Sequence, residues 1–137
     1  MVKNIVTDTM FLMQKSEPAT KSDEYIITDL LDTITANRDH CVGMAANMIG
    51  FRKKIIVVLV DGEYTIMVNP EIVEKSKQIY ETMESCLSLI GSRPATRHKN
   101  ITVEYLDKKF KPKKRRFNDF EAQVIQHEID HFDGILI

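Results

Sequence analysis

The chain has few cysteines, prolines and glycines and no tryptophan: among its 137 residues are two cysteines, four prolines and five glycines. It has no apolar run near the roughly 18 residues that cross a bilayer. Its N-terminus lacks the basic and apolar segments of a secretory signal. The formal net charge of −1 argues against general binding to nucleic acid or to a membrane surface. We therefore expect a cytoplasmic protein that binds neither DNA nor a membrane.

Cys41 and Cys86 are far apart in sequence, and in a reducing compartment they are predicted to be thiols rather than a disulfide. The composition, 43% hydrophobic and 28% charged, is that of an ordinary globular protein. A length of 137 residues is enough for one packed core, so residues 1–137 are expected to form a single domain. Nothing in the sequence requires more than a monomer.

The most informative stretch is QHEIDH, at residues 126–131. Four residues span about 400° of an α-helix, so His127 and His131 would share one face, about a turn apart, where both reach one divalent ion. Glu128 is offset by about 100°, which puts its carboxylate beside the metal, as a general base that activates water requires. If the segment is helical, it is predicted to be a metal site.

The ends of this helix are marked in the sequence. Asn118 is a suitable N-cap with Glu121 three residues later to reciprocate, and Gly134 supplies a left-handed stop. Phe120 and Val124 share a stripe with the two histidines, which predicts an apolar face that enters the core. The alternative is a chance motif on a solvated helix, with each histidine an ordinary polar residue.

Hydrophobic periodicity predicts the remaining elements. They are a short helical turn within 5–14, an amphipathic helix at 23–37, strands at 55–60, 64–68, 101–106 and 110–117, and a weak strand within 71–80. Asp61–Gly62 is expected to turn the first strand pair into a hairpin. Asn69–Pro70 is expected to end its second strand, and Pro94 marks a loop.

Two other stretches each have two interpretations. The small residues of 41–50 indicate either a close approach of the backbone to a ligand or a tight turn in the core. The segment Lys108 to Arg116 has seven Lys or Arg residues in nine. It is typical of a solvated edge strand that blocks aggregation with charge, and the alternative is a patch that contacts RNA.

A catalytic tetrahedral site needs three protein ligands and an open position, so the two histidines require a third donor. Cys86 is the best candidate, because a thiolate binds zinc or ferrous iron well. His98, His40 and Asp133 are alternatives, but none of them lies in a supporting motif.

Three segments in order, GMAANMIG, ESCLS and QHEIDH, resemble the three motifs of peptide deformylases, which read roughly GxGLAAxQ, EGCLS and QHExDH. The similarity extends over essentially the whole chain, and the ordered combination is highly specific. The resemblance implies an α+β fold in which antiparallel β-sheets pack around the C-terminal HExxH helix, with an amphipathic helix near the N-terminus.

The resemblance also implies a reaction, the hydrolysis of the N-formyl group from formylmethionyl nascent peptides. One divalent ion, expected to be Fe²⁺ with Zn²⁺ or Ni²⁺ as alternatives, would be held by Cys86, His127 and His131. Glu128 would be the general base, and the backbone N–H of Leu87 would stabilise the developing oxyanion. Glu84 is interpreted as orienting a neighbouring ligand or loop.

Helix geometry suggests how a substrate would bind. Phe120, Gln123 and Val124 lie one or two turns before His127, so they would line a pocket for a methionine side chain. Val42 and the backbone of Gly43 would lie opposite. On structural grounds alone, residues such as Phe120 and Val124 are more often simply part of the core.

The chain departs from the family pattern at three positions. Cys41 and Ser85 replace glycines, and Met48 replaces the glutamine that, in the family, donates a hydrogen bond to the oxyanion. A thioether cannot donate, so we expect reduced activity. Asn47 would substitute only if the local backbone rotated. Cys41 is interpreted as a buried inert thiol, or as a second, oxidation-sensitive thiol near the pocket.

We therefore expect a deformylase-like metallohydrolase that acts on N-formylated nascent peptides and contacts the ribosome transiently through Lys108 to Arg116. A metallopeptidase would share HExxH and the glutamate, but its third ligand is more often Glu, His or Asp. A non-catalytic formyl-peptide-binding module would explain the loss of the family's glutamine. It would not explain a general base beside an open metal position.

Overall fold

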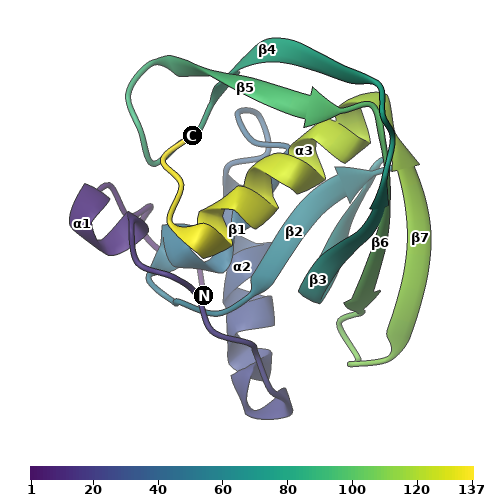
Figure 1. Cartoon of the computed structure of the whole chain (residues 1–137). Coiled ribbons are helices and arrows are strands. Elements are labelled where there is room, and N and C mark those ends of the chain that lie inside the picture. Colours follow the sequence, from purple (N-terminus) through teal and green to yellow (C-terminus); the bar gives the residue numbers. More distant parts are fainter.

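An antiparallel sheet with a helix on each face forms the centre of the computed structural model, which describes all of residues 1–137 (Figure 1). The helices are α1 (Thr9–Leu12), α2 (Glu24–Ala36) and α3 (Asp119–Asp130), with 3₁₀ turns η1 (Lys21–Asp23), η2 (Ala46–Ile49) and η3 (His131–Asp133). The strands are β1 (Gly43–Ala45), β2 (Ile55–Val60), β3 (Glu63–Lys75), β4 (Ile79–Ser85), β5 (Ser92–His98), β6 (Asn100–Leu106) and β7 (Pro112–Asn118).

The larger sheet has five strands in the order β1-β2-β3-β6-β7, all antiparallel. β2 and β3 form the predicted hairpin around Asp61–Gly62, with Ile55 opposite Val68. β3 then continues past β2 and pairs through its second half with β6. β4 and β5 form a separate two-stranded ribbon that passes over α3 in Figure 1.

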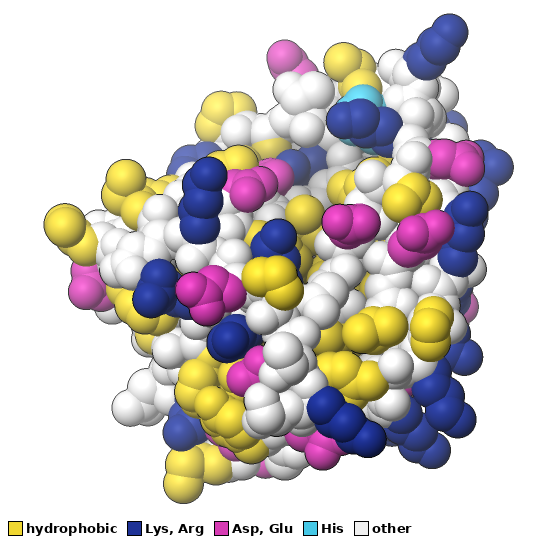
Figure 2. Space-filling view, turned by 60° about the horizontal axis from the view of Figure 1, so that its bottom comes forward, with side chains coloured by type: hydrophobic (Ala, Val, Ile, Leu, Met, Phe, Trp, Pro, Cys, Tyr) yellow, Lys and Arg dark blue, Asp and Glu magenta, His cyan; other side chains and the backbone are white.

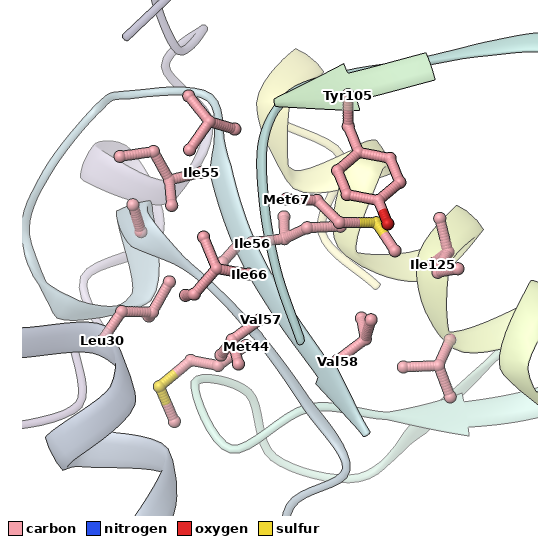
Figure 3. Close-up of a cluster of buried hydrophobic side chains, with 14 of the residues drawn as sticks. Leu30, Met44, Ile55, Ile56, Val57, Val58, Ile66, Met67, Tyr105 and Ile125 are labelled. Carbon is pink, nitrogen blue, oxygen red and sulfur yellow. The ribbon is translucent and has the colours of Figure 1, made fainter. Parts of the chain in front are cut away.

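The side chains of β2 point alternately toward two buried faces (Figure 3). Ile55 and Val57 point toward Leu30 of α2, whereas Ile56 and Val58 point toward Ile125 of α3. All of these residues are at most 1% exposed. Because helices cover both faces of the strand, its sequence is a continuous apolar run rather than an alternating one.

α3 therefore lies between the five-stranded sheet on one side and the β4–β5 ribbon on the other. Its buried residues include Ile125 toward the sheet and Gln126, His127 and Glu128. Gln126 makes polar contacts with β5: its side-chain oxygen accepts from the His98 backbone N–H at 2.9 Å, and its amide nitrogen donates to the His98 carbonyl at 2.8 Å. The ribbon thus brings polar groups to the outer face of α3.

Two predictions about proline were wrong. β3 continues through Asn69–Pro70 instead of ending there. Its pairing with β6 shifts register between Val68 and Glu71, so the missing N–H of Pro70 breaks no hydrogen bond of the sheet. Asn69 adopts a φ of 50° there, and its side chain bonds the backbone of Ala19 instead. Pro94 lies within β5 rather than in a loop; β5 has only β4 as a neighbour, so it tolerates a missing donor.

The start of α3 also differs from the prediction. Asn118 occupies the N-cap position, but its side chain makes no capping hydrogen bond. Glu121 accepts from the backbone N–H of Asp61 at 3.0 Å, so it ties the β2–β3 turn to the helix. At the other end Gly134 adopts the predicted left-handed conformation, with a φ of 73°. Phe120 was expected in the core but is 59% exposed.

The structure confirms the predicted α+β class, in which antiparallel sheets pack around a C-terminal helix. His127 lies in this helix and His131 directly follows it. α2 covers the predicted amphipathic segment and buries Ile26, Ile27, Leu30 and Ile34. None of the helices combines the length and the hydropathy needed to cross a membrane.

Candidate metal centre

Three potential ligands from two distant parts of the chain meet beside α3. Cys86 follows the last residue of β4, His127 lies in α3, and His131 begins η3. One ligand atom from each lies within 4.8 Å of the others. Cys86 Sγ is 3.7 Å from His131 Nε2, and the two imidazole rings are 5.0 Å apart at 78°. This arrangement brings the sulfur of Cys86 and two imidazoles to a common point, so the three residues predicted as ligands do meet.

A chain of buried charged groups holds His127. Its Nδ1 lies 2.8 Å from Glu84 Oε1, and because a carboxylate only accepts, Nδ1 carries the proton and Nε2 is left for a metal. Arg97 donates to both oxygens of Glu84, at 2.9 and 2.6 Å, and to Asp130 at 2.6 Å. The prediction that Glu84 orients a neighbouring ligand agrees with this contact.

Burial and hydrogen bonding set the charges of these groups. Burial alone would raise the pKa of Glu84, but hydrogen bonds from Arg97 and His127 lower it to about 2. Burial alone would lower the pKa of His127, but hydrogen bonds with Cys86 and Glu84 raise it to about 10. A metal must therefore displace a proton from His127. Burial and the charge on His127 lower the pKa of His131 to about 3, so this imidazole is neutral.

Glu128 has an unusual environment for a carboxylate. It is 4% exposed, its Oε1 has no hydrogen-bond partner, and this atom lies 3.7 Å from His131 Nε2. Burial raises the pKa of Glu128 to about 7, against the attraction of His127. A Cβ at Gly43 would lie 2.7 Å from Glu128 Oε2, so the glycine makes room for this side chain. An unpartnered buried carboxylate next to the ligand cluster is suited to proton transfer.

A cavity of about 340 Å³ opens beside these groups. All the predicted substrate-binding residues line it: Val42, Gly43, Phe120 and Val124. The residues predicted to be catalytic line it as well: Met48, Leu87 and Glu128. So do two of the three candidate ligands, Cys86 and His127. That these residues bind a substrate stays a prediction. His131 is 2% exposed and does not line the cavity.

Met48 lies at the cavity with its sulfur against the ligand cluster. It is 1% exposed, and its Sδ is 3.9 Å from Cys86 Sγ and 3.4 Å from the Ala45 backbone nitrogen. Asn47 does not replace a missing donor, because its amide nitrogen lies 3.3 Å from the His131 carbonyl and it does not line the cavity.

The alternative third ligands lie elsewhere. His98 Nδ1 is 2.7 Å from the Ser76 carbonyl, and His40 lines the cavity without joining the ligand cluster. Asp133 is not part of the cluster either. Cys41 lines the cavity too, as a thiol whose pKa burial raises to about 12.

Sequence reasoning missed two residues of this site. Arg97 contacts Glu84, from which it is separated by 13 residues in sequence. Tyr80 contacts Gln123, from which it is separated by 43 residues. Arg97 carries no motif, and the signal that could have found it is an arginine on the inward face of a strand. Asp130, inside QHEIDH, was the available clue to a cationic partner.

The sulfur of Cys86 after β4 meets two imidazoles and a buried glutamate of the α3–η3 segment beside this cavity, and such a set of groups is typical of a metal-dependent hydrolase. A family model described as polypeptide deformylase matches residues 2–137, and the chain belongs to that family. The resemblance seen in the three motifs is thereby confirmed.

Individual relatives agree. The chain is 57% identical to a peptide deformylase of Clostridium beijerinckii over 137 residues, the full length of both proteins. It is similar to the crystal structure of peptide deformylase from Ehrlichia chaffeensis, with a TM-score of 0.89, 29% identity, and coverage of 99% of this chain and 86% of that one. It is also similar to the crystal structure of a class I type b peptide deformylase from Acinetobacter baumannii bound to Met-Ala-Ser. The TM-score is 0.89 at 25% identity, and the match covers 99% of this chain and 96% of that one.

Proposed function

We propose that this protein hydrolyses the N-formyl group of formylmethionyl nascent peptides and releases formate. The observation that carries the proposal is the unpartnered carboxylate of Glu128, buried beside three potential metal ligands at the wall of a cavity. Membership of the polypeptide deformylase family supports it. So does the Met-Ala-Ser tripeptide bound by the similar protein from Acinetobacter baumannii.

The residues present fit a divalent ion. Cys86, His127 and His131 offer one soft and two borderline donors at a common point, and the Glu84 contact with Nδ1 of His127 directs Nε2 of this imidazole toward that point. These three residues would hold one ion, with Fe²⁺ expected and Zn²⁺ or Ni²⁺ able to use the same donors. When bound, the ion supplies Lewis acidity and lowers the pKa of water.

The protein's own groups manage the proton. Glu128 accepts a proton from the water that attacks the formyl carbon and delivers it to the leaving amine as the C–N bond breaks, so formate and a free amino terminus result. The Leu87 backbone N–H is the donor we assign to the developing oxyanion. Met48 occupies the other donor position without an N–H to offer, so turnover is expected to be slower than with glutamine there.

The cavity receives the first residue of the peptide. Val124 is buried, and Phe120 is exposed at the cavity mouth. Val42 and the side-chain-free backbone of Gly43 complete the wall. A cavity of about 340 Å³ with these apolar groups in its wall has room for a methionine side chain.

We further propose that Lys108 to Arg116 contacts ribosomal RNA while the nascent chain emerges. Four consecutive residues of β7, Lys113 to Arg116, are exposed, and their ion pairs with Asp107, Glu104 and Asp61 are loose, at 3.9 Å. Lys and Arg side chains gather toward the lower right of Figure 2, the side where β7 lies in Figure 1. On this account the protein acts in the cytoplasm as a monomer with one catalytic domain.

The test is anaerobic turnover of formyl-Met-Ala-Ser by the Fe²⁺-loaded protein, followed by formate detection and mass spectrometry of the peptide. Formate together with intact Met-Ala-Ser is the expected result. Cleavage of the Met–Ala bond without formate would make the protein a metallopeptidase. Tight binding of the formylated peptide with neither product would make it a binding module.

A further inference from the structure

A polar side chain lies between two apolar ones on the part of the cavity wall that α3 forms. Gln123 lines the cavity together with Phe120 and Val124, and it lies four residues before His127 on α3. That spacing corresponds to about one helical turn, or about 6 Å along the axis. A peptide side chain that extended into the cavity from a bond held at the metal centre would therefore come near Gln123.

The side chain of Gln123 is held in place. Tyr80 of β4 donates its hydroxyl hydrogen to Gln123 Oε1 at 2.9 Å. The same strand also contacts His127 through Glu84. Tyr80 and Glu84 are four residues apart on β4, and their partners Gln123 and His127 are four residues apart on α3. Tyr80 and Glu84 lie on the same face of β4, because side chains two and four residues apart in a strand point to the same side.

The hydrogen bond decides which end of the amide is free. Tyr80 occupies Oε1, and the amide nitrogen of Gln123 has no protein partner, although the residue is only partly exposed. Burial raises the pKa of Tyr80, which keeps its hydroxyl in the donating form. The wall thus presents two N–H donors, where an apolar residue would present none.

We propose that Gln123 is a specificity-determining residue that donates from its amide nitrogen to an acceptor on the first side chain of the substrate. This inference rests on the proposed function and refines its substrate class: formyl-methionine and, with a stronger acceptor, formyl-methionine sulfoxide. The sulfoxide oxygen accepts strongly and the thioether sulfur weakly, whereas norleucine, of nearly the same shape, accepts nothing. A donor left unpaired in a filled cavity penalises norleucine.

The competing explanation is structural: the Tyr80–Gln123 bond would merely fasten the ribbon to α3. In that case its loss would lower stability and would affect all three substrates equally. A specificity role predicts a change in the ratio between substrates, which a loss of stability does not produce.

The experiment compares kcat/KM for formyl-Met-Ala-Ser, its sulfoxide and its norleucine analogue with the Fe²⁺-loaded protein. The variants are Gln123→Met, which keeps the size but removes the donors, and Tyr80→Phe, which removes the orienting hydroxyl. Gln78→Met, at an exposed position, is the matched control. We expect Gln123→Met to reduce the sulfoxide-to-norleucine ratio about tenfold or more, Tyr80→Phe to reduce it less, and Gln78→Met to leave it unchanged.

Binding of the three unformylated peptides, measured by calorimetry on the same proteins, separates this inference from the proposed function. If no formate appears but wild type prefers the sulfoxide peptide and Gln123→Met does not, the reaction is wrong and the specificity role stands. If formate appears and the ratio is the same in wild type and Gln123→Met, the specificity role is overturned. If no peptide binds or reacts, both are overturned.

Discussion

The Nδ1 atom of His127 lies 2.8 Å from Oε1 of Glu84, and both residues are less than a tenth exposed. This contact joins a strand to a helix across 43 residues of sequence. It fixes the tautomer of a candidate ligand, and through Arg97 it extends to Asp130, the residue before His131. The geometry of both candidate imidazoles thus depends on charges that β4 and β5 supply.

Glu84→Gln is expected to weaken the metal centre and the fold together. The substitution leaves Asp130 as the only carboxylate that pairs with the buried guanidinium of Arg97. We expect the free energy of unfolding to fall by about 3 kcal/mol, because one partner of a buried ion pair is lost. Metal affinity should fall about 10- to 100-fold, as for other partners of ligating histidines. Chemical denaturation and metal titration measure the two effects. Glu81→Gln, an exposed position on the same strand, should change neither, and equal effects in both variants would contradict the account.

Gly43→Ala is expected to slow turnover without unfolding the protein. The added Cβ would lie 2.6 Å from Val124 Cγ1 and 2.7 Å from Glu128 Oε2, so the carboxylate must move. Misplacing a catalytic group by about 1 Å can cost about 100-fold in rate, and we expect kcat to fall by about 10- to 100-fold. Steady-state kinetics, with thermal denaturation and metal content as controls, test this prediction. An unchanged kcat would show that the Glu128 position does not matter.

Cys41 is expected to react slowly with iodoacetamide until the pH is well above 9. Burial, with the nearby charge of Glu128, raises the pKa of this thiol from 9.0 to about 12, and its sulfur lies 2.8 Å from the Gly43 carbonyl. A raised pKa means that the reactive thiolate forms only at higher pH, so the alkylation rate should rise about tenfold per pH unit from 9 to 11. Peptide mapping by mass spectrometry reads the site, and the denatured protein is the control. A rate that levels off near pH 9 would show an exposed thiol.

Met48→Gln is expected to accelerate deformylation. Met48 lies 3.9 Å from Cys86 at the cavity but has no hydrogen to donate, and restoring an oxyanion donor is worth up to about 10²- to 10³-fold in favourable cases. We expect a rise in kcat of about tenfold or more, with KM little changed. Met10→Gln, at an exposed position of α1, is the matched control. A lower or equal kcat at the same metal content would mean that Met48 is not at an oxyanion position.

Local signals were enough to predict much of this molecule. The apolar run of β2, the Asp61–Gly62 turn and the helix α3 each depend on neighbours in sequence, and all three were predicted, although Phe120 of the α3 stripe is exposed. Motif spacing together with a family resemblance also predicted the three candidate ligands, which meet in the structure. These features need no knowledge of which segments meet in space.

The errors involve long-range contacts. Pro70 lies within β3 because β2 and β6 pair with different halves of that strand, and no local pattern reports such an exchange. Glu121 bonds Asp61 rather than capping its own helix, since the β2–β3 turn approaches it. Arg97 and Tyr80 became part of the site only because the β4–β5 ribbon folds over α3.

The most direct test of the account is formate release by the Fe²⁺-loaded protein and its Glu128→Gln variant, under anaerobic conditions with formyl-Met-Ala-Ser. Glutamine keeps the shape but cannot accept the proton of the attacking water, so the rate should fall about 10²- to 10⁴-fold while metal content stays the same. Glu104→Gln, which changes an exposed carboxylate on β6, should retain the wild-type rate. A Glu128→Gln variant that releases formate within a few-fold of wild type would contradict the assignment of this residue as the general base.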